Sequence, residues 1–178
     1  MKNKILLLLV GILLLTSCGS VRVVSDYDPA VNYATYTSFA FFKPGIDKAP
    51  ISDLDKKRIL RAIEVELTSK NLQKSNTPNL LVSIFTKEKE RVDVYQNQFG
   101  FGWGWNPWWG FGNMNPTVSR TTEGVLFIDL IDAATKELVW QGKATAKLLP
   151  HKSVAKREAR IQDIVREIFK QFPPEVKP

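Results

Sequence analysis

Two segments of opposite polarity constrain the fold of this chain more than any other feature. Residues 79–94 begin with alternating apolar side chains and become highly charged over 87–91. Residues 118–132 reverse this order, because polar and β-branched residues precede an apolar run. A period of two indicates strands, so we predict one long antiparallel hairpin, apolar at its base, with an outer half that stands clear of the core. At about 3.4 Å per residue it would extend on the order of 50 Å. A disordered excursion is the competing interpretation.

Three shorter strands are predicted around this hairpin. Residues 21–24 and 37–42 are rich in β-branched or aromatic residues, and the sequence Lys-Pro-Gly over 43–45 is expected to stop the second strand. A turn over 132–136 leads into a last strand, 138–148, which Pro150 ends.

Two amphipathic helices complete the pattern. The first is predicted over 53–72, where Ser52 and Asp55 have the spacing of a capping box. Ser153 is placed to cap the second, and the Pro-Pro pair at 173–174 ends it. Its apolar residues recur at helical spacing: Ile161, Ile164, Val165, Ile168 and Phe172.

The order β-β-α-β-β-β-α lacks the regular alternation that a parallel sheet requires. We therefore predict an α+β fold with a largely antiparallel sheet, two helices packed on one face, and a long hairpin that carries a Gly/Trp-rich loop.

The N-terminus has the pattern of a lipoprotein signal peptide. A basic start precedes the apolar run 5–15, which is shorter than the about 20 residues of a membrane-spanning helix. Small residues then precede Cys18, the only cysteine. We predict cleavage of residues 1–17 and lipidation of Cys18 with acyl chains such as palmitate. Residues 18–20 would be a short tether, and 21–178 a single domain.

This export signal restricts the compartment and the partners. Gly19 and Ser20 follow the cysteine, a pattern that favours the outer membrane, with the domain facing the periplasm. The formal net charge of +7 falls to +5 when Lys2 and Lys4 are removed with the signal peptide. Export argues against nucleic acid as the partner of this basic surface. Anionic lipid or polymer suits it better, although an ordinary solvated surface is the simpler explanation of these charges.

A loop insertion rich in glycine and aromatic residues occupies 96–116. Within 99–112, seven residues are aromatic and five are glycine. That much glycine disfavours a helix or a regular strand, whereas a flexible linker would carry serine and charge in place of tryptophan. The candidate contact residues are Trp103, Trp105, Trp108, Trp109, Phe99, Phe101 and Phe111.

Three interpretations of this loop remain open. Its rings can fold back over the sheet, or the segment can be a low-complexity insert without a role. They can enter a membrane interface, where tryptophan concentrates. They can also recognise an envelope protein or a glycan, because tryptophan dominates binding hot spots and stacks on sugars.

The sequence predicts neither an enzyme nor a bound cofactor or metal. His151 is the only histidine and lies beside a proline before the final helix, so we expect it in a loop. With one cysteine and one histidine, the usual zinc ligand sets cannot form. Asp129 and Asp132 carry carboxylates, the groups that act in pairs in glycosidases. Three apart on a strand, they would point to opposite faces.

Several motifs in this order resemble a family of bacterial lipoproteins, the domain of unknown function 4136 family. They are the cysteine-ended signal, Asp-Tyr-Asp-Pro at 26–29, the aromatic strand around Phe39, Pro-Asn-Leu at 78–80, Glu-Gly at 123–124, Leu-Val-Trp-Gln-Gly at 138–142 and Phe-Pro-Pro at 172–174. Asn79 and Gln141 depart from the pattern, which favours an acidic residue and an arginine there.

The resemblance implies an α+β envelope lipoprotein without an established activity. It also implies structural roles for three residues: Trp140 as a core ring, Glu123 as a strand start and Asp28 as a turn residue. We expect a non-enzymatic lipoprotein that contacts protein or membrane through residues 99–112. The alternative is a binding module for cell-wall or surface glycan.

Overall fold

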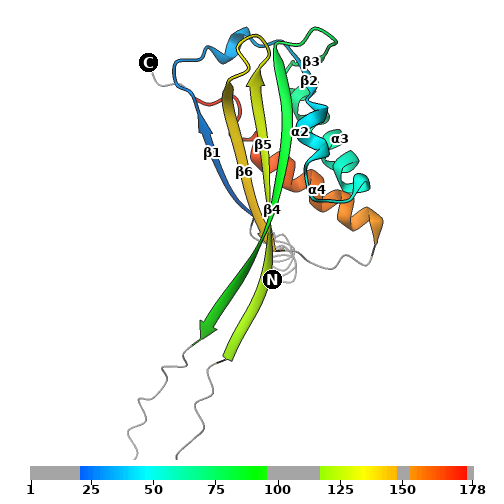
Figure 1. The fold of residues 1–178 in the computed structure, drawn as a ribbon, viewed down its shortest axis with the longest axis vertical. Helices are drawn as coiled ribbons and strands as arrows, with labels where there is room; N and C mark the ends of the chain where they lie inside the picture. The colour runs from blue at the N-terminus through cyan, green and yellow to red at the C-terminus, as the bar shows by residue number, and fades with distance from the viewer. Residues whose placement is uncertain (1–20, 96–116, 148–152, 176–178) are drawn as a thin grey trace, which may run out of the picture.

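Six strands form one mixed sheet in the order β1-β6-β5-β4-β2-β3 (Figure 1). The computed structural model describes residues 21–95, 117–147 and 153–175. The strands are β1 Arg22–Tyr27, β2 Ser38–Phe41, β3 Gln73–Lys74, β4 Leu80–Tyr95, β5 Thr117–Asp132 and β6 Leu138–Lys147. The helices are α2 Lys43–Asp47, α3 Asp53–Ser69 and α4 Val154–Phe169, and a 3₁₀ turn, η1, covers Tyr33–Thr35.

Most neighbouring strands are antiparallel, as predicted. The exception is β2, which runs parallel to both β4 and β3. The connection from β2 to β4 contains α2 and α3, and parallel neighbours need such a long crossover. The α+β prediction is therefore confirmed, with a parallel edge added to a mostly antiparallel sheet.

The long hairpin is also confirmed. β4 and β5 pair without interruption from Leu80 opposite Asp132 to Tyr95 opposite Thr117. β6 ends at Lys147, opposite Glu123, so among the described strands only β4 and β5 continue beyond that point. We call this two-stranded part, 90–95 with 117–122, the arm. In Figure 1 it projects from the end of the sheet, away from the helices.

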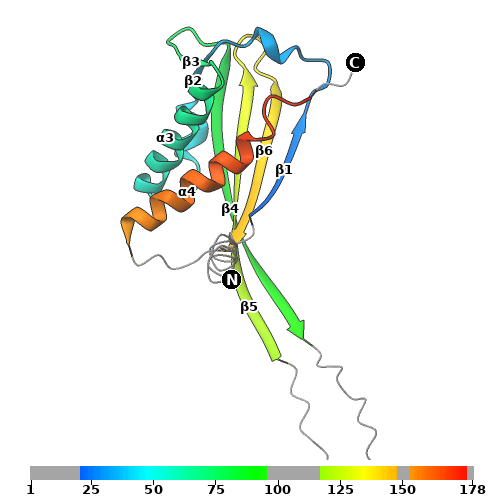
Figure 2. The same ribbon diagram turned by 180° about the vertical axis from the view of Figure 1, so that it is seen from behind.

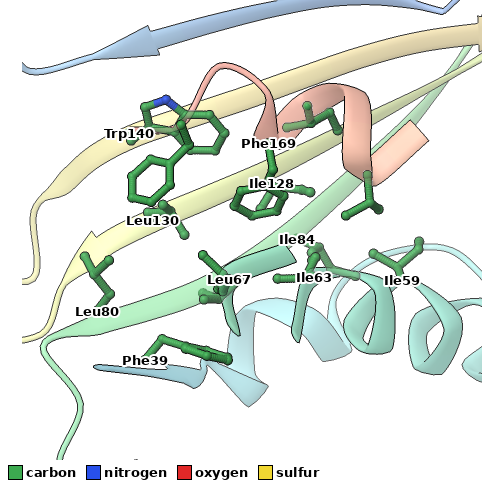
Figure 3. Close-up of a cluster of buried hydrophobic side chains, with 14 of the residues drawn as sticks. Phe39, Ile59, Ile63, Leu67, Leu80, Ile84, Ile128, Leu130, Trp140 and Phe169 are labelled. Carbon is green, nitrogen blue, oxygen red and sulfur yellow. The ribbon is translucent and has the colours of Figure 1, made fainter. Parts of the chain in front are cut away.

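Helices α3 and α4 lie on one face of the sheet, as Figure 2 shows from behind. The core between these layers is aliphatic around Ile63, Leu67 and Ile128 and aromatic at Trp140 (Figure 3). The Trp140 ring stacks on Phe169 at a centroid distance of 5.7 Å. Gly142 makes this packing possible, because a Cβ there would lie 2.4 Å from the Trp140 ring and 2.3 Å from Ile168.

Both predicted helix caps are present. The Ser52 hydroxyl accepts a hydrogen bond from the Asp55 amide, and the Ser153 hydroxyl accepts one from the Lys156 amide. The first helix ends at Ser69, three residues before the predicted end. Asn71 follows in the left-handed conformation, with φ of 66°, a common way for helices to terminate.

Strand β2 ends at Phe41, so residues 43–45 follow its end as predicted, and they also open helix α2, which the sequence did not predict. Pro44 occupies the first turn of this helix, where proline needs no amide hydrogen. Ile46 is buried in the core. Gly45 allows α2 to approach β4 closely, since a Cβ there would lie 2.2 Å from the Ser83 hydroxyl.

Candidate functional site

The predicted lipidation site and the contact loop lie outside the described residues. This applies to Cys18, to His151 and to all seven aromatic residues named in 99–112. The described residues contain the arm that leads to this loop, and a cleft and an aromatic patch near its root. These three features are the candidate functional surfaces.

The arm begins where the third strand of the sheet ends. The pairs from Glu90 opposite Thr122 to Tyr95 opposite Thr117 involve only β4 and β5. At about 3.4 Å per residue this ribbon extends about 20 Å beyond the body of the sheet. Its hydrogen bonds keep its two strands together, so the 96–116 segment starts and ends at the far end of a paired ribbon.

The first residues of the domain lie at the same end of the sheet as the arm. β1 starts at Arg22, which pairs with Thr145 near the end of β6. The Arg22 guanidinium also lies 3.4 Å from the Glu123 carboxylate, where the arm begins. The chain that leads back to Cys18 therefore leaves the domain beside the arm.

A cleft of about 1070 Å³ opens at the root of the arm, between the sheet and the first turns of α3 and α4. We call it the root cleft. In Figure 1, α4 diverges from the strands towards its N-terminal end. Its apolar lining comes from both layers: Ile51, Ile59, Leu126, Ala144, Ala146, Ile161 and Ile164.

A cluster of charges borders this cleft. The Asp55 carboxylate accepts hydrogen bonds from the Arg58 guanidinium at 2.8 Å and from the Arg157 guanidinium of the other helix. The Ser52 hydroxyl also donates to Asp55, at 2.9 Å. This cluster connects the first turns of α3 and α4, and thereby fixes one wall of the cleft.

The opposite face of the sheet carries an aromatic patch that the sequence interpretation missed. The Phe85 and Phe127 rings lie 5.9 Å apart on neighbouring strands, and Phe85 is 40% exposed. Lys87 lies 5.4 Å from the Phe85 ring and Lys143 lies 5.5 Å from Phe127. The sequence contains a signal for this patch, because apolar residues occur on both faces of β4 and not only on the face that the helices cover.

The two aspartates of the hypothetical pair are separate, as predicted. Asp129 accepts a hydrogen bond from the Gln141 amide at 2.7 Å on the neighbouring strand. Asp132 accepts bonds from the amides of Ala134 and Thr135 in the turn and from the Tyr36 hydroxyl. Neither arrangement resembles a pair of carboxylates that share a substrate.

These environments shift the pKa values of the two aspartates in opposite directions. Burial raises the pKa of Asp129, and the bond from Gln141 only partly offsets this. Hydrogen bonds from the Thr135 amide and the Tyr36 hydroxyl lower the pKa of Asp132. Asp132 therefore stabilises the fold above the pKa of an unfolded aspartate, and this contribution is lost as the pH falls through its folded pKa. Asp129 lowers the free energy of unfolding as the pH rises through the interval between its unfolded and raised folded pKa.

We expect substitution by asparagine to have opposite effects at the two sites. At pH 7, Asp132→Asn should lower the melting temperature and Asp129→Asn should raise it. The difference for Asp129 should shrink as the pH falls below the pKa of an unfolded aspartate, whereas the difference for Asp132 should shrink only at lower pH, as the pH falls through its lowered folded pKa. Thermal unfolding followed by circular dichroism across this pH range measures them. Shifts of the same sign at pH 7 would contradict the assignment.

Among the described residues, no group of three histidine, cysteine, aspartate or glutamate side chains is placed to hold a metal ion. Within the same ranges, no helix is long and apolar enough to cross a membrane.

The family follows from a comparison over most of the chain. Residues 23–174 match the family model described as Domain of unknown function (DUF4136). The chain belongs to this family. Trp140 is fully buried and Asp28 accepts a bond from the Ala30 amide in a turn, in agreement with the roles that the resemblance implied. Glu123 lies inside β5 and does not start it, since β5 begins at Thr117.

Two solved structures that match this chain illustrate the similarity, both at low sequence identity. A PDZ domain protein from Parabacteroides distasonis is 16% identical, with a TM-score of 0.50; the match covers 86% of this chain and 35% of that protein. This chain thus corresponds to about a third of that longer protein, and the likeness concerns the fold alone. PelC from Paraburkholderia phytofirmans, crystallised as a dodecamer, is 9% identical, with a TM-score of 0.49 and coverage of 84% and 95%. No match was found among curated proteins.

Proposed function

We propose that this protein is a non-enzymatic lipoprotein of the cell envelope, anchored through Cys18 in the outer membrane and facing the periplasm. In this proposal it acts by contact, with residues 99–112 held at the end of the arm. The observation that carries the proposal is the arm itself, because a paired ribbon that leaves the sheet holds a loop away from the domain.

The geometry favours the membrane as the surface that the loop contacts. Cys18 is four residues from Arg22, so its lipid lies within about 14 Å of the sheet. The arm leaves the same end of the sheet and extends about 20 Å beyond it. Because the arm is longer than the tether, a domain anchored at Cys18 brings the end of its arm to the bilayer surface. Tryptophan side chains prefer this interface.

Tryptophan emission can test membrane contact directly. Four of the five tryptophans lie in 99–112, so Trp140→Phe leaves fluorescence from the loop alone. We expect residues 19–178 with this substitution to show a blue shift when titrated with liposomes of phosphatidylglycerol and phosphatidylethanolamine. Circular dichroism first checks that the substituted domain is folded.

Three other outcomes would redirect the proposal. A red spectrum that lipid does not change would leave the rings for a protein or a glycan, and saturable binding of a soluble sugar polymer would then support the glycan module. A blue spectrum before lipid is added would mean that the rings pack against the protein. Deletion of 99–112 that changes stability alone would remove any role in contact.

A further inference from the structure

The root cleft is large for a space left by imperfect packing. Its volume of about 1070 Å³ lies just above the usual range for small-molecule sites, about 300–1,000 Å³. It lies on the helix-covered face of the sheet, at the end where the arm begins. It is therefore separate from the aromatic patch on the opposite face.

Small side chains on the strands create the cleft. Side chains at alternate positions of a strand share one face, and the helix-facing positions of β6 are Trp140, Gly142, Ala144 and Ala146. The Trp140 ring fills the space below the helices at one end of this row. Ala144 and Ala146, with Gly124 beside them on β5, leave it open at the other end.

The apolar residues of α4 are also less buried towards the end of the helix that borders the cleft. Its apolar stripe is fully buried at Val165, Ile168 and Phe169, where Trp140 and the β-strands meet it. One turn earlier, Ile161 and Ile164 are only partly buried and line the cleft. The result is a continuous apolar surface of side chains that the protein core leaves uncovered, which suits a hydrocarbon chain.

A polar group inside the cleft lacks a partner. Thr86 lines the cleft, and its hydroxyl oxygen is buried without a hydrogen-bond partner among the described residues. Buried hydroxyl groups are normally hydrogen-bonded. A ligand with an ester or carboxylate oxygen could satisfy this donor.

The charges around the cleft favour an anionic ligand. On the helix side, Arg157 and Arg160 contribute to its lining together with Asp55 and Glu88, whereas the Lys87 side chain lies against the aromatic patch on the opposite face. Asp55 is already paired with Arg58 and Arg157. The cluster of Asp55 with Arg58 and Arg157 therefore carries one net positive charge, and together with Arg160 it is complementary to a phosphate or carboxylate head group.

We propose that the root cleft binds one acyl chain of an anionic membrane lipid, with the chain on the apolar floor and the head group at the basic rim. The lipid attached to Cys18 would also supply acyl chains. It carries no anionic group, however, so the charge of the rim favours a separate lipid. This proposal rests on the cleft alone and does not depend on the function proposed for the 99–112 loop.

The test compares two lipids with the same chain and different heads. All helices and strands of the described residues lie within 22–169, so we use residues 19–178 for this test. We expect this chain to bind one molecule of palmitoyl lysophosphatidylglycerol in native mass spectrometry and calorimetry, below the micelle concentration. Binding of palmitoyl lysophosphatidylcholine, which has a zwitterionic head, should be about tenfold weaker. Arg157→Gln should reduce this preference.

Substitutions on one helix locate the bound chain. Ile161→Gln places an amide in the apolar wall and should weaken binding about tenfold. Val154→Gln, on the same helix but 65% exposed and outside the lining, should leave affinity unchanged. Thermal unfolding confirms that both variants fold, and the comparison of head groups on the unsubstituted chain does not depend on either variant.

Several results would overturn the proposal. They are the absence of saturable binding, equal affinity for the two lipids, or an Ile161→Gln variant that binds as well as the control. Loss of binding on deletion of 99–112 would place the lipid at the loop. A lipidated full chain that no longer binds, while residues 19–178 do, would place the Cys18 lipid in the cleft.

Discussion

Trp140→Ala should lower the free energy of unfolding of residues 19–178 by about 3–5 kcal/mol, the cost of removing a large aromatic side chain from a core. The Trp140 ring is fully buried, stacks on Phe169 and meets the edge of Phe172 at a centroid distance of 5.2 Å. Its indole nitrogen has no hydrogen-bond partner among the described residues, so the loss comes from packing alone. Urea denaturation followed by circular dichroism measures it.

The same strand provides the control for this substitution. Leu138, two residues before Trp140, is 50% exposed, and Leu138→Ala should cost less than about 1 kcal/mol because little buried area is lost. A loss below about 1 kcal/mol for Trp140→Ala would mean that the helices do not close over this end of the sheet. Gly142 would then have no packing reason to be glycine.

Local patterns were sufficient to predict the larger elements. The reversed polarity of 79–94 and 118–132 identified two strands that pair over their whole length, because alternation and charge are read from neighbouring residues. Ser52 and Ser153 marked the starts of both long helices for the same reason. These signals require no knowledge of distant contacts.

Features that depend on distant contacts were not predictable. Pro44 and Gly45 carry the local signal of a strand end, yet Ile46 gains a place in the core, and this makes a short helix favourable. Ala144 and Ala146 look unremarkable in a strand, and only the position of α4 makes them the floor of a cleft. The Phe85–Phe127 pair depends on strand register, which the sequence alone does not fix.

The loop and the anchor remain predictions from sequence, but the described fold gives them a common geometry. The start of β1, the arm and the root cleft all lie at one end of the sheet. The opposite end holds the Tyr33 and Phe172 rings and the chain turns. In the proposed function, this polarity presents one end of the domain to the membrane and the other to the periplasm, which is why both proposals concern lipid.

Asp55→Ala should lower the free energy of unfolding by about 2 kcal/mol, because it leaves charged donors without their acceptor. Asp55 is buried and connects α3 to α4 through Arg58 and Arg157, and Arg58 itself is largely buried. The substitution also removes half of the capping interaction with Ser52. Urea denaturation again measures the loss. The contact between the first turns of α3 and α4, which forms one wall of the cleft, should weaken as well.

Asp53→Ala separates this effect from a general loss of charge at the helix start. Asp53 lies two residues earlier in the same first turn, is 89% exposed and pairs only with Lys56 among the described residues, at 3.6 Å. Its removal should cost about 0.5 kcal/mol, the usual range of an exposed pair and of the helix dipole. Lipid binding should weaken in Asp55→Ala and remain unchanged in Asp53→Ala if the connection between α3 and α4 shapes the cleft. Equal stability losses in the two variants would show that the connection contributes nothing beyond an ordinary surface pair.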